Sequence, residues 1–308
     1  SGDNAARFSV STSSCKTLYA SENKSTVNLI IMKRIYFVLV GLLFLIQSIH
    51  SQVTFNFGKP DFDNATVLLT DGKILIGELQ DFSSPNTVEF YGGFGSATEE
   101  FEQISNFDRK KIKFRKSKNE PYRFIPSDSI DVIQFFDEEL NKTVEFKRLR
   151  IFKSFDGEIR DSKRIVFLPL FKKDNINVYG YHVYSSGHYA TTIIYINNPK
   201  NNIAINPYEM SIGELFTAKK TLTDRITSSY KFVSENCTDF HKWIDEKYIQ
   251  EYGEIFTPNY KATRQIVKEE KKKLKTKLEK RNLENQKWTE FYTKLVEHAI
   301  EKYKEFCK

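Results

Sequence analysis

Cysteine is scarce in this sequence, with 3 residues in 308, and no two of them form a CxxC motif. Cys237 and His241 are one helical turn apart, but no third ligand stands at a spacing typical of metal sites. The glycines of Gly92-Gly93-Phe94-Gly95 lack the strand-to-helix context of a phosphate-binding loop and indicate a turn. We therefore expect neither a metal nor a cofactor.

Long apolar runs are also lacking. The run at residues 35–46 has 12 residues, whereas a helix that crosses a bilayer needs about 20. Lys33 and Arg34 precede this run, and the more polar residues 47–51 follow it, which is the order of parts in a cleavable signal peptide. We predict a signal peptide at residues 32–51, and hence an exported protein that is periplasmic, associated with the outer envelope or secreted.

Residues 1–31 have no hydrophobic periodicity, and we interpret them as an upstream leader without a structural role. The mature chain, residues 52–308, has 257 residues, which is enough for a sizeable hydrophobic core. It keeps two cysteines, Cys237 and Cys307, and an exported protein lives where thiols tend to oxidise. A disulfide between them requires Cα atoms within about 7 Å of each other, and the sequence alone leaves this pairing open.

The mature chain is nearly neutral, but its charge is uneven. It carries 42 basic and 38 acidic side chains, of which 15 basic and 8 acidic ones lie in residues 261–308. This basic end can bind an anionic membrane surface. However, its lysines and glutamates are interleaved, as they are on a solvated helix face. Binding of nucleic acid is the less favoured interpretation.

Residues 52–208 are expected to form a β-rich module, because short β-branched and aromatic runs alternate with Asp, Gly, Asn, Ser and Pro. The clearest unit is a hairpin in which two apolar runs flank Asp71-Gly72. Further strands are predicted at 87–91, 111–115, 122–125, 130–136, 143–152, 164–171, 178–184, 189–196 and 203–205. The predicted fold class is α+β, with an antiparallel β-rich front and helices behind it.

Helices are predicted after this module. Ser211-Ile-Gly-Glu214 resembles a capping box before a helix that reaches about Ile226, and residues 236–239 repeat this start signal. Both helices belong to a helical part at 209–260 that packs on the sheet. Thr257-Pro258-Asn259 is expected to interrupt the helical pattern.

Residues 261–308 are predicted to form a long basic amphipathic helix, either continuous or broken. Its apolar stripe consists of Trp288, Tyr292, Leu295, Ala299, Tyr303 and Phe306. The stripe is expected to pack on its own domain or on a protein partner, such as another component of the envelope.

Cys237 stands in the first turn of a predicted helix, where the helix N-terminus lowers the pKa of a thiol. His188 begins an apolar strand, and Asn206 ends the next one. Together they supply the parts of cysteine-based acyl transfer, with Cys237 as nucleophile, His188 as general base and Asn206 as the residue that orients the imidazole. The alternative is that Cys237 is a core or disulfide cysteine and that His188 faces solvent.

Two resemblances to known proteins bear on function. His188 followed by Asn236-Cys237-Thr-Asp-Phe240 resembles the permuted papain-like hydrolases and acyltransferases. The hairpin around Asp71-Gly72, then Val88-Glu-Phe, Phe124-Ile-Pro-Ser-Asp-Ser-Ile-Asp-Val-Ile and Phe146-Lys-Arg-Leu are similar to a family of uncharacterised exported proteins of Bacteroidota. This second resemblance implies an envelope or secreted protein with a β-rich front and a helical back, and it brings no catalytic residues.

We accordingly expect a non-enzymatic exported protein that acts in envelope structure or interaction. The first alternative is a cysteine hydrolase or acyltransferase that uses Cys237 and His188. The second alternative is binding to an anionic surface through residues 261–308.

Overall fold

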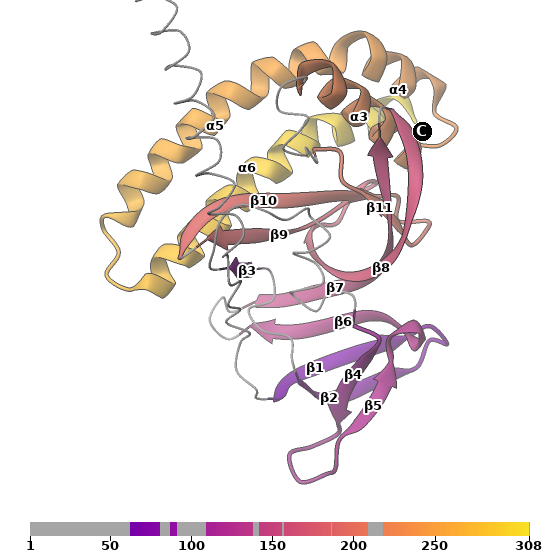
Figure 1. Cartoon of the computed structure of the whole chain (residues 1–308), viewed down its shortest axis with the longest axis vertical. Coiled ribbons are helices and arrows are strands. Elements are labelled where there is room, and N and C mark those ends of the chain that lie inside the picture. Colours follow the sequence, from indigo (N-terminus) through magenta and orange to yellow (C-terminus); the bar gives the residue numbers. More distant parts are fainter. Residues whose placement is uncertain are drawn as a thin grey trace, which may run out of the picture. The chain divides into compact units, whose positions relative to one another are not determined.

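The computed structural model describes residues 62–80, 87–90, 109–137, 142–155, 157–185, 187–208 and 218–307. All of these residues belong to one compact unit. The predicted leader and signal peptide, the glycine-rich stretch at 92–95 and the capping box at 211–214 lie outside the described residues. In the described part of the chain, strands are followed by helices (Figure 1), which confirms the α+β class.

The predicted hairpin around Asp71-Gly72 is confirmed, and it joins β1 (Phe62–Leu69) to β2 (Ile74–Gln80). Gly72 has a φ of 84°, a conformation that glycine adopts without a steric penalty. The next strands are β3 (Thr87–Phe90), β4 (Lys111–Arg115), β5 (Arg123–Pro126) and β6 (Ile130–Asp137). Antiparallel pairing gives the order β6-β1-β2-β4-β5, while β3 pairs in parallel with β9.

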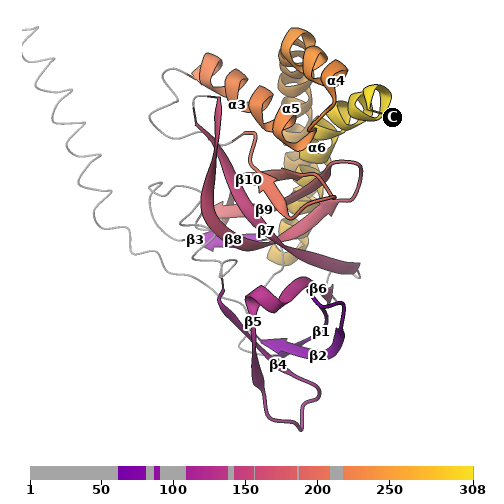
Figure 2. The same ribbon diagram turned by 90° about the vertical axis from the view of Figure 1, so that its right-hand side faces the viewer.

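Two long strands, β7 (Lys142–Phe155) and β8 (Glu158–Lys172), continue the sheet. They are followed by β9 (Asn177–Ser185), β10 (His188–Asn197) and β11 (Ile203–Ile205). β11 pairs with β10 and also, in parallel, with β7. This second pairing closes β7 to β11 into a small barrel. Figure 2 shows strands β7 to β10 with the helices on one side of them.

Strand β9 is buried on both faces, because strands cover one face and helices cover the other. Tyr179 and Tyr181 belong to a core formed by strand residues, whereas Val178 belongs to a second core shared with the helices. A Cβ atom at Gly180 would lie 2.4 Å from the carbonyl oxygen of Ile193. Only glycine therefore allows β9 and β10 to approach this closely.

The helices are α3 (Ala218–Val233), α4 (Thr238–Trp243), α5 (Ile249–Lys271) and α6 (Lys277–Phe306), and a π-helical turn, η4 (Ile244–Tyr248), joins α4 to α5. α3 continues beyond its predicted end at Ile226, because Tyr230 and Val233 are buried in the second core. α3 contacts β8 and β10, and α6 contacts the same two strands, so both helices pack on the sheet.

The predicted interruption at Thr257-Pro258-Asn259 is wrong, since α5 continues through Pro258. Proline removes one helical hydrogen bond and disfavours a helix interior. Packing compensates here, because the rings of Phe256 and Tyr260 lie 5.6 and 5.9 Å from the ring of Phe291 in α6. The helical pattern is interrupted instead between the end of α5 at Lys271 and the start of α6 at Lys277.

The predicted stripe of α6 packs within its own unit. Trp288, Leu295 and Ala299 are buried, and Tyr292, Tyr303 and Phe306 pack against the second core. Tyr189 of β10 stacks on Trp288, with ring centroids 4.9 Å apart. The stripe is therefore the contact through which α6 is held against the sheet.

Candidate functional site

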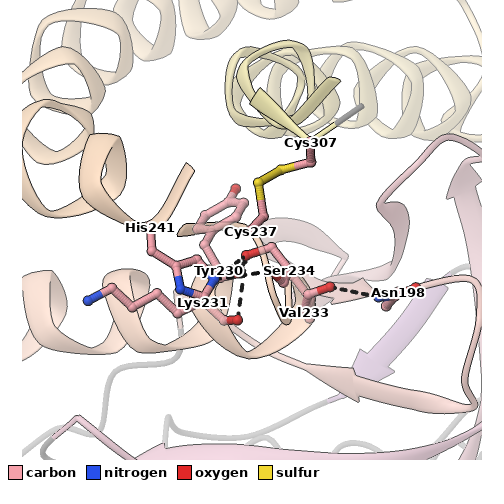
Figure 3. The surroundings of a disulfide bond; sticks show 8 residues. All are labelled: Asn198, Tyr230, Lys231, Val233, Ser234, Cys237, His241 and Cys307. Atoms are coloured by element: carbon pink, nitrogen blue, oxygen red, sulfur yellow. Dashed lines mark hydrogen bonds between the residues drawn. A yellow bond between two sulfur atoms is a disulfide. The ribbon is translucent and has the colours of Figure 1, made fainter. Parts of the chain in front are cut away.

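Cys237 and Cys307 form a disulfide bond that ties the start of α4 to the end of α6 (Figure 3). Their Cα atoms lie 5.7 Å apart, within the range that a disulfide requires. Cys237 is the N-cap residue of α4 and is only 7% exposed. Because its sulfur is bonded to a second sulfur, Cys237 lacks the thiolate that the predicted nucleophile needs.

The structure does not bring His188 to Cys237. His188 is exposed at the first position of β10. Asn198, just beyond the other end of β10, donates a hydrogen bond of 3.0 Å to the carbonyl oxygen of Val233, close to Cys237 (Figure 3). Ten residues of extended strand span roughly 30 Å. The imidazole and the sulfur therefore lie at opposite ends of the strand, beyond the reach of proton transfer.

Asn206 and His241 bond to nearby parts of the backbone. The side-chain oxygen of Asn206 accepts a hydrogen bond of 2.9 Å from the backbone N–H of Tyr208. Nε2 of His241 lies 3.1 Å from both the carbonyl oxygen and the hydroxyl of Ser234. Among the residues that the structure describes, no three His, Cys, Asp or Glu side chains gather as a metal site would require.

Helices α5 and α6 form an antiparallel hairpin, which is the candidate site that the structure favours instead. Side-chain contacts connect the two helices along their length. They are Glu251 with His298 at 2.6 Å, the Phe256 and Phe291 rings at 5.6 Å, and Lys271 with Glu284 at 2.6 Å. The last of these contacts, the ion pair between Lys271 and Glu284, joins the two helices next to the turn of the hairpin.

A capping box begins α6 directly after this turn. The Thr276 hydroxyl accepts a hydrogen bond of 3.1 Å from the backbone N–H of Glu279, whose carboxylate accepts one of 2.9 Å from the backbone N–H of Thr276. These bonds satisfy N–H groups that a helix start leaves without partners. The bond from the Thr276 backbone lowers the pKa of the Glu279 carboxyl, and the bond with its side chain adds to this.

The excess of positive over negative charge in the C-terminal segment is confined to this end of the hairpin. Residues 261–281, which we call the hairpin tip, hold 10 basic and 3 acidic side chains. The remaining residues, 282–308, hold 5 of each sign. The whole excess of seven positive charges in residues 261–308 therefore belongs to the tip.

Most of these cations form no ion pair. Lys271 is paired with Glu284, and the Arg281 guanidinium lies 4.8 Å from the ring centre of Tyr184. The other eight basic residues of the tip form no ion pair with any residue in the described part of the chain. They are Lys261, Arg264, Lys268, Lys272, Lys273, Lys275, Lys277 and Lys280.

The tip also exposes two large apolar side chains. Ile266 on α5 is 42% exposed, and Leu278 in the first turn of α6 is 46% exposed. A surface that combines unpaired lysines with exposed aliphatic groups can attract an anionic surface and insert apolar atoms into its boundary region. One feature of the sequence indicates that the charge is divided between a basic tip and a neutral remainder. It is the run Lys271-Lys272-Lys273, which coincides with the break between α5 and α6.

Across the described residues, every helix is either too short or too polar to cross a membrane. No protein-family model matches this chain, and neither a curated protein nor a solved structure resembles it closely enough to count as a match.

Proposed function

We propose that this chain is an exported, non-enzymatic protein that attaches to anionic membrane surfaces through the hairpin tip. The observation that carries the proposal is the confinement of the excess positive charge to residues 261–281. Each Lys or Arg near an anionic bilayer contributes about 1 kcal/mol of attraction. The attractions of the eight unpaired cations at this end of the hairpin add together, and their sum favours attachment.

The exposed aliphatic side chains favour lipid over nucleic acid as the occupant. Ile266 and Leu278 leave water when they enter the boundary between headgroups and acyl chains, and this transfer is favourable. A phosphate backbone without lipid offers them no such environment. The absence of aromatic side chains within 261–281 also removes the platforms on which single-stranded bases stack.

The disulfide supports both the exported and the non-enzymatic parts of the proposal. Disulfides such as Cys237–Cys307 persist in oxidising compartments and are rare in the cytosol. The same bond occupies the two cysteines that follow residue 51. A cysteine hydrolase would need one of them as a free thiolate.

Co-sedimentation of the mature chain with lipid vesicles tests the attachment. We expect binding to vesicles that contain phosphatidylglycerol, weak binding to pure phosphatidylcholine, and release as salt rises. The variant with Lys272, Lys273, Lys275 and Lys277 changed to Gln should bind on the order of 10³-fold more weakly at low salt. A matched control changes the exposed Lys110, Lys111, Lys116 and Lys118 to Gln and should bind as the unchanged protein does.

Two results would contradict the proposal. One is equal binding to the two kinds of vesicle, and the other is binding that salt does not weaken. A double variant, Ile266→Ser with Leu278→Ser, should weaken vesicle binding without changing retention on a sulfonated cation-exchange resin. The partner is nucleic acid if a DNA duplex binds more tightly than the vesicles and the double variant changes neither of these two affinities.

A further inference from the structure

A pocket of about 310 Å³ opens where β6 and β11 diverge on one edge of β7. β6 pairs with β7 up to Lys147, and β11 begins to pair with it at Arg150. Residues 148 and 149 have no partner strand on this edge. The starts of β6 and β11 therefore become the walls of the pocket, whose volume lies at the lower end of the range for small-molecule sites.

The pocket contains a cation without a partner. Arg150 binds Asp161 in a two-point contact, with Nε 3.1 Å from Oδ1, and Asp131 lies 3.9 Å from the ammonium of Lys147. The guanidinium of Arg148 has no hydrogen-bond or ion-pair partner among the described residues. Of the three charged residues that line the pocket, Asp131, Arg148 and Arg150, only Arg148 lacks an ion-pair partner among the described residues.

Isoleucines from two strands supply an accessible apolar wall. Ile165 of β8 and Ile203 of β11 line the pocket with partly exposed side chains, and the fully buried Ile130 of β6 lies behind them. Ile165 is 40% exposed although it lies in the middle of a long strand. Covering such a side chain would remove apolar surface from water, which is favourable.

We propose that this pocket binds a small monocarboxylate with a branched aliphatic body. Arg148 would donate two parallel hydrogen bonds to the carboxylate, a geometry that the planar guanidinium provides. The isoleucine side chains would cover the aliphatic body. The single negative charge of the ligand would balance the single unpaired positive charge of the pocket. This site is separate from the hairpin tip.

Nuclear magnetic resonance of the mature chain with labelled isoleucine methyl groups tests the proposal directly. Isovalerate, added in the millimolar range, is expected to shift the methyl signals of Ile165 and Ile203. Isovaleramide has the same body but no charge, and it should bind about tenfold more weakly. The proposal is overturned if isovalerate shifts none of these signals, or if the acid and the amide bind equally well.

Two variants identify the cation. Arg148→Gln is expected to lower the affinity for isovalerate about tenfold, to the level of the amide, whereas Arg148→Lys keeps the charge and should retain part of the affinity. Arg264→Gln, an unpaired arginine of the hairpin tip, serves as the matched control. Unchanged binding by a folded Arg148→Gln would overturn the assignment. If that variant does not fold, the methyl shifts in the unchanged protein decide whether the pocket binds isovalerate in preference to the amide.

Discussion

The hydroxyl of Tyr208, which follows β11, lies 3.0 Å from the hydroxyl of Tyr230 in α3. The hydroxyl of Tyr248 lies 3.3 Å from that of Tyr230 and completes a cluster of three. Burial raises the pKa of each of these tyrosines well above its usual value, because a phenolate here would lose its hydration. The cluster is therefore a neutral hydrogen-bonded contact between the sheet and the helices.

Because the folded pKa values are raised, the three tyrosines stabilise the fold fully below about pH 10, the unfolded pKa. This stabilisation decreases as pH rises above that value. In an alkaline titration, we expect phenolate absorbance from these residues to appear only together with the loss of near-ultraviolet circular dichroism. Ionisation of every tyrosine in a protein that keeps its tertiary signal would contradict this.

Tyr230→Phe removes the hydroxyl that Tyr208 and Tyr248 share. We expect it to lower the free energy of unfolding by about 1 to 2 kcal/mol at neutral pH, since it leaves buried hydroxyls with fewer partners. Urea denaturation measures this change. Tyr122→Phe is the control, because Tyr122 is 53% exposed and should show almost no effect.

Opening the Cys237–Cys307 bond should destabilise the fold without abolishing the packing around it. The cysteines are separated by 70 residues, and closing a loop of this length contributes about 4 kcal/mol in the chain-entropy model. We expect the double change of both cysteines to Ser to lower the urea midpoint accordingly. In the unchanged protein, thiol labelling without reductant should leave Cys237 unmodified. Rapid labelling of Cys237 below pH 7 would instead favour the cysteine hydrolase hypothesis.

Replacing Pro258 in α5 should stabilise the protein. Pro258→Ala restores an N–H group that can donate to the carbonyl four residues earlier, and proline in a helix interior costs about 3 kcal/mol relative to alanine. We expect a gain of about 1 to 3 kcal/mol in the free energy of unfolding, measured by thermal or urea denaturation. Pro199→Ala, in an exposed turn, should be neutral or slightly destabilising. Equal effects of the two changes would argue against this account.

The capping box at the start of α6 gives a fifth prediction. Thr276→Ala removes the hydroxyl that accepts from Glu279, and loss of such a cap costs about 1 kcal/mol. Hydrogen exchange should show the first turn of α6 opening more readily, while the amides near Ala299 stay protected. Thr257→Ala, an exposed residue inside α5, is the matched control and should leave this exchange unchanged.

Local chemistry explains why much of the fold was predictable. The hairpin at Asp71-Gly72 and the strand β4 arise from turn chemistry and alternation within a few residues. The start of α4 was predicted within one residue, although its N-cap is Cys237 and no side chain caps it. The apolar stripe of α6 likewise predicted which of its faces packs. Pro258 was misjudged because its local preference was outweighed by aromatic packing against α6, a contact with residues far along the chain.

The sequence by itself determined the α+β class, the order of strands before helices and the basic character of residues 261–308. Only the tertiary structure decided that Cys237 pairs with Cys307, that His188 lies at the far end of β10, and that the unpaired lysines gather at a hairpin tip. It also decided that β11 joins β7 beyond the last contact with β6, which creates the pocket around Arg148. The reason is physical: strand and helix periods are set by neighbouring residues, whereas these four features depend on contacts between distant segments.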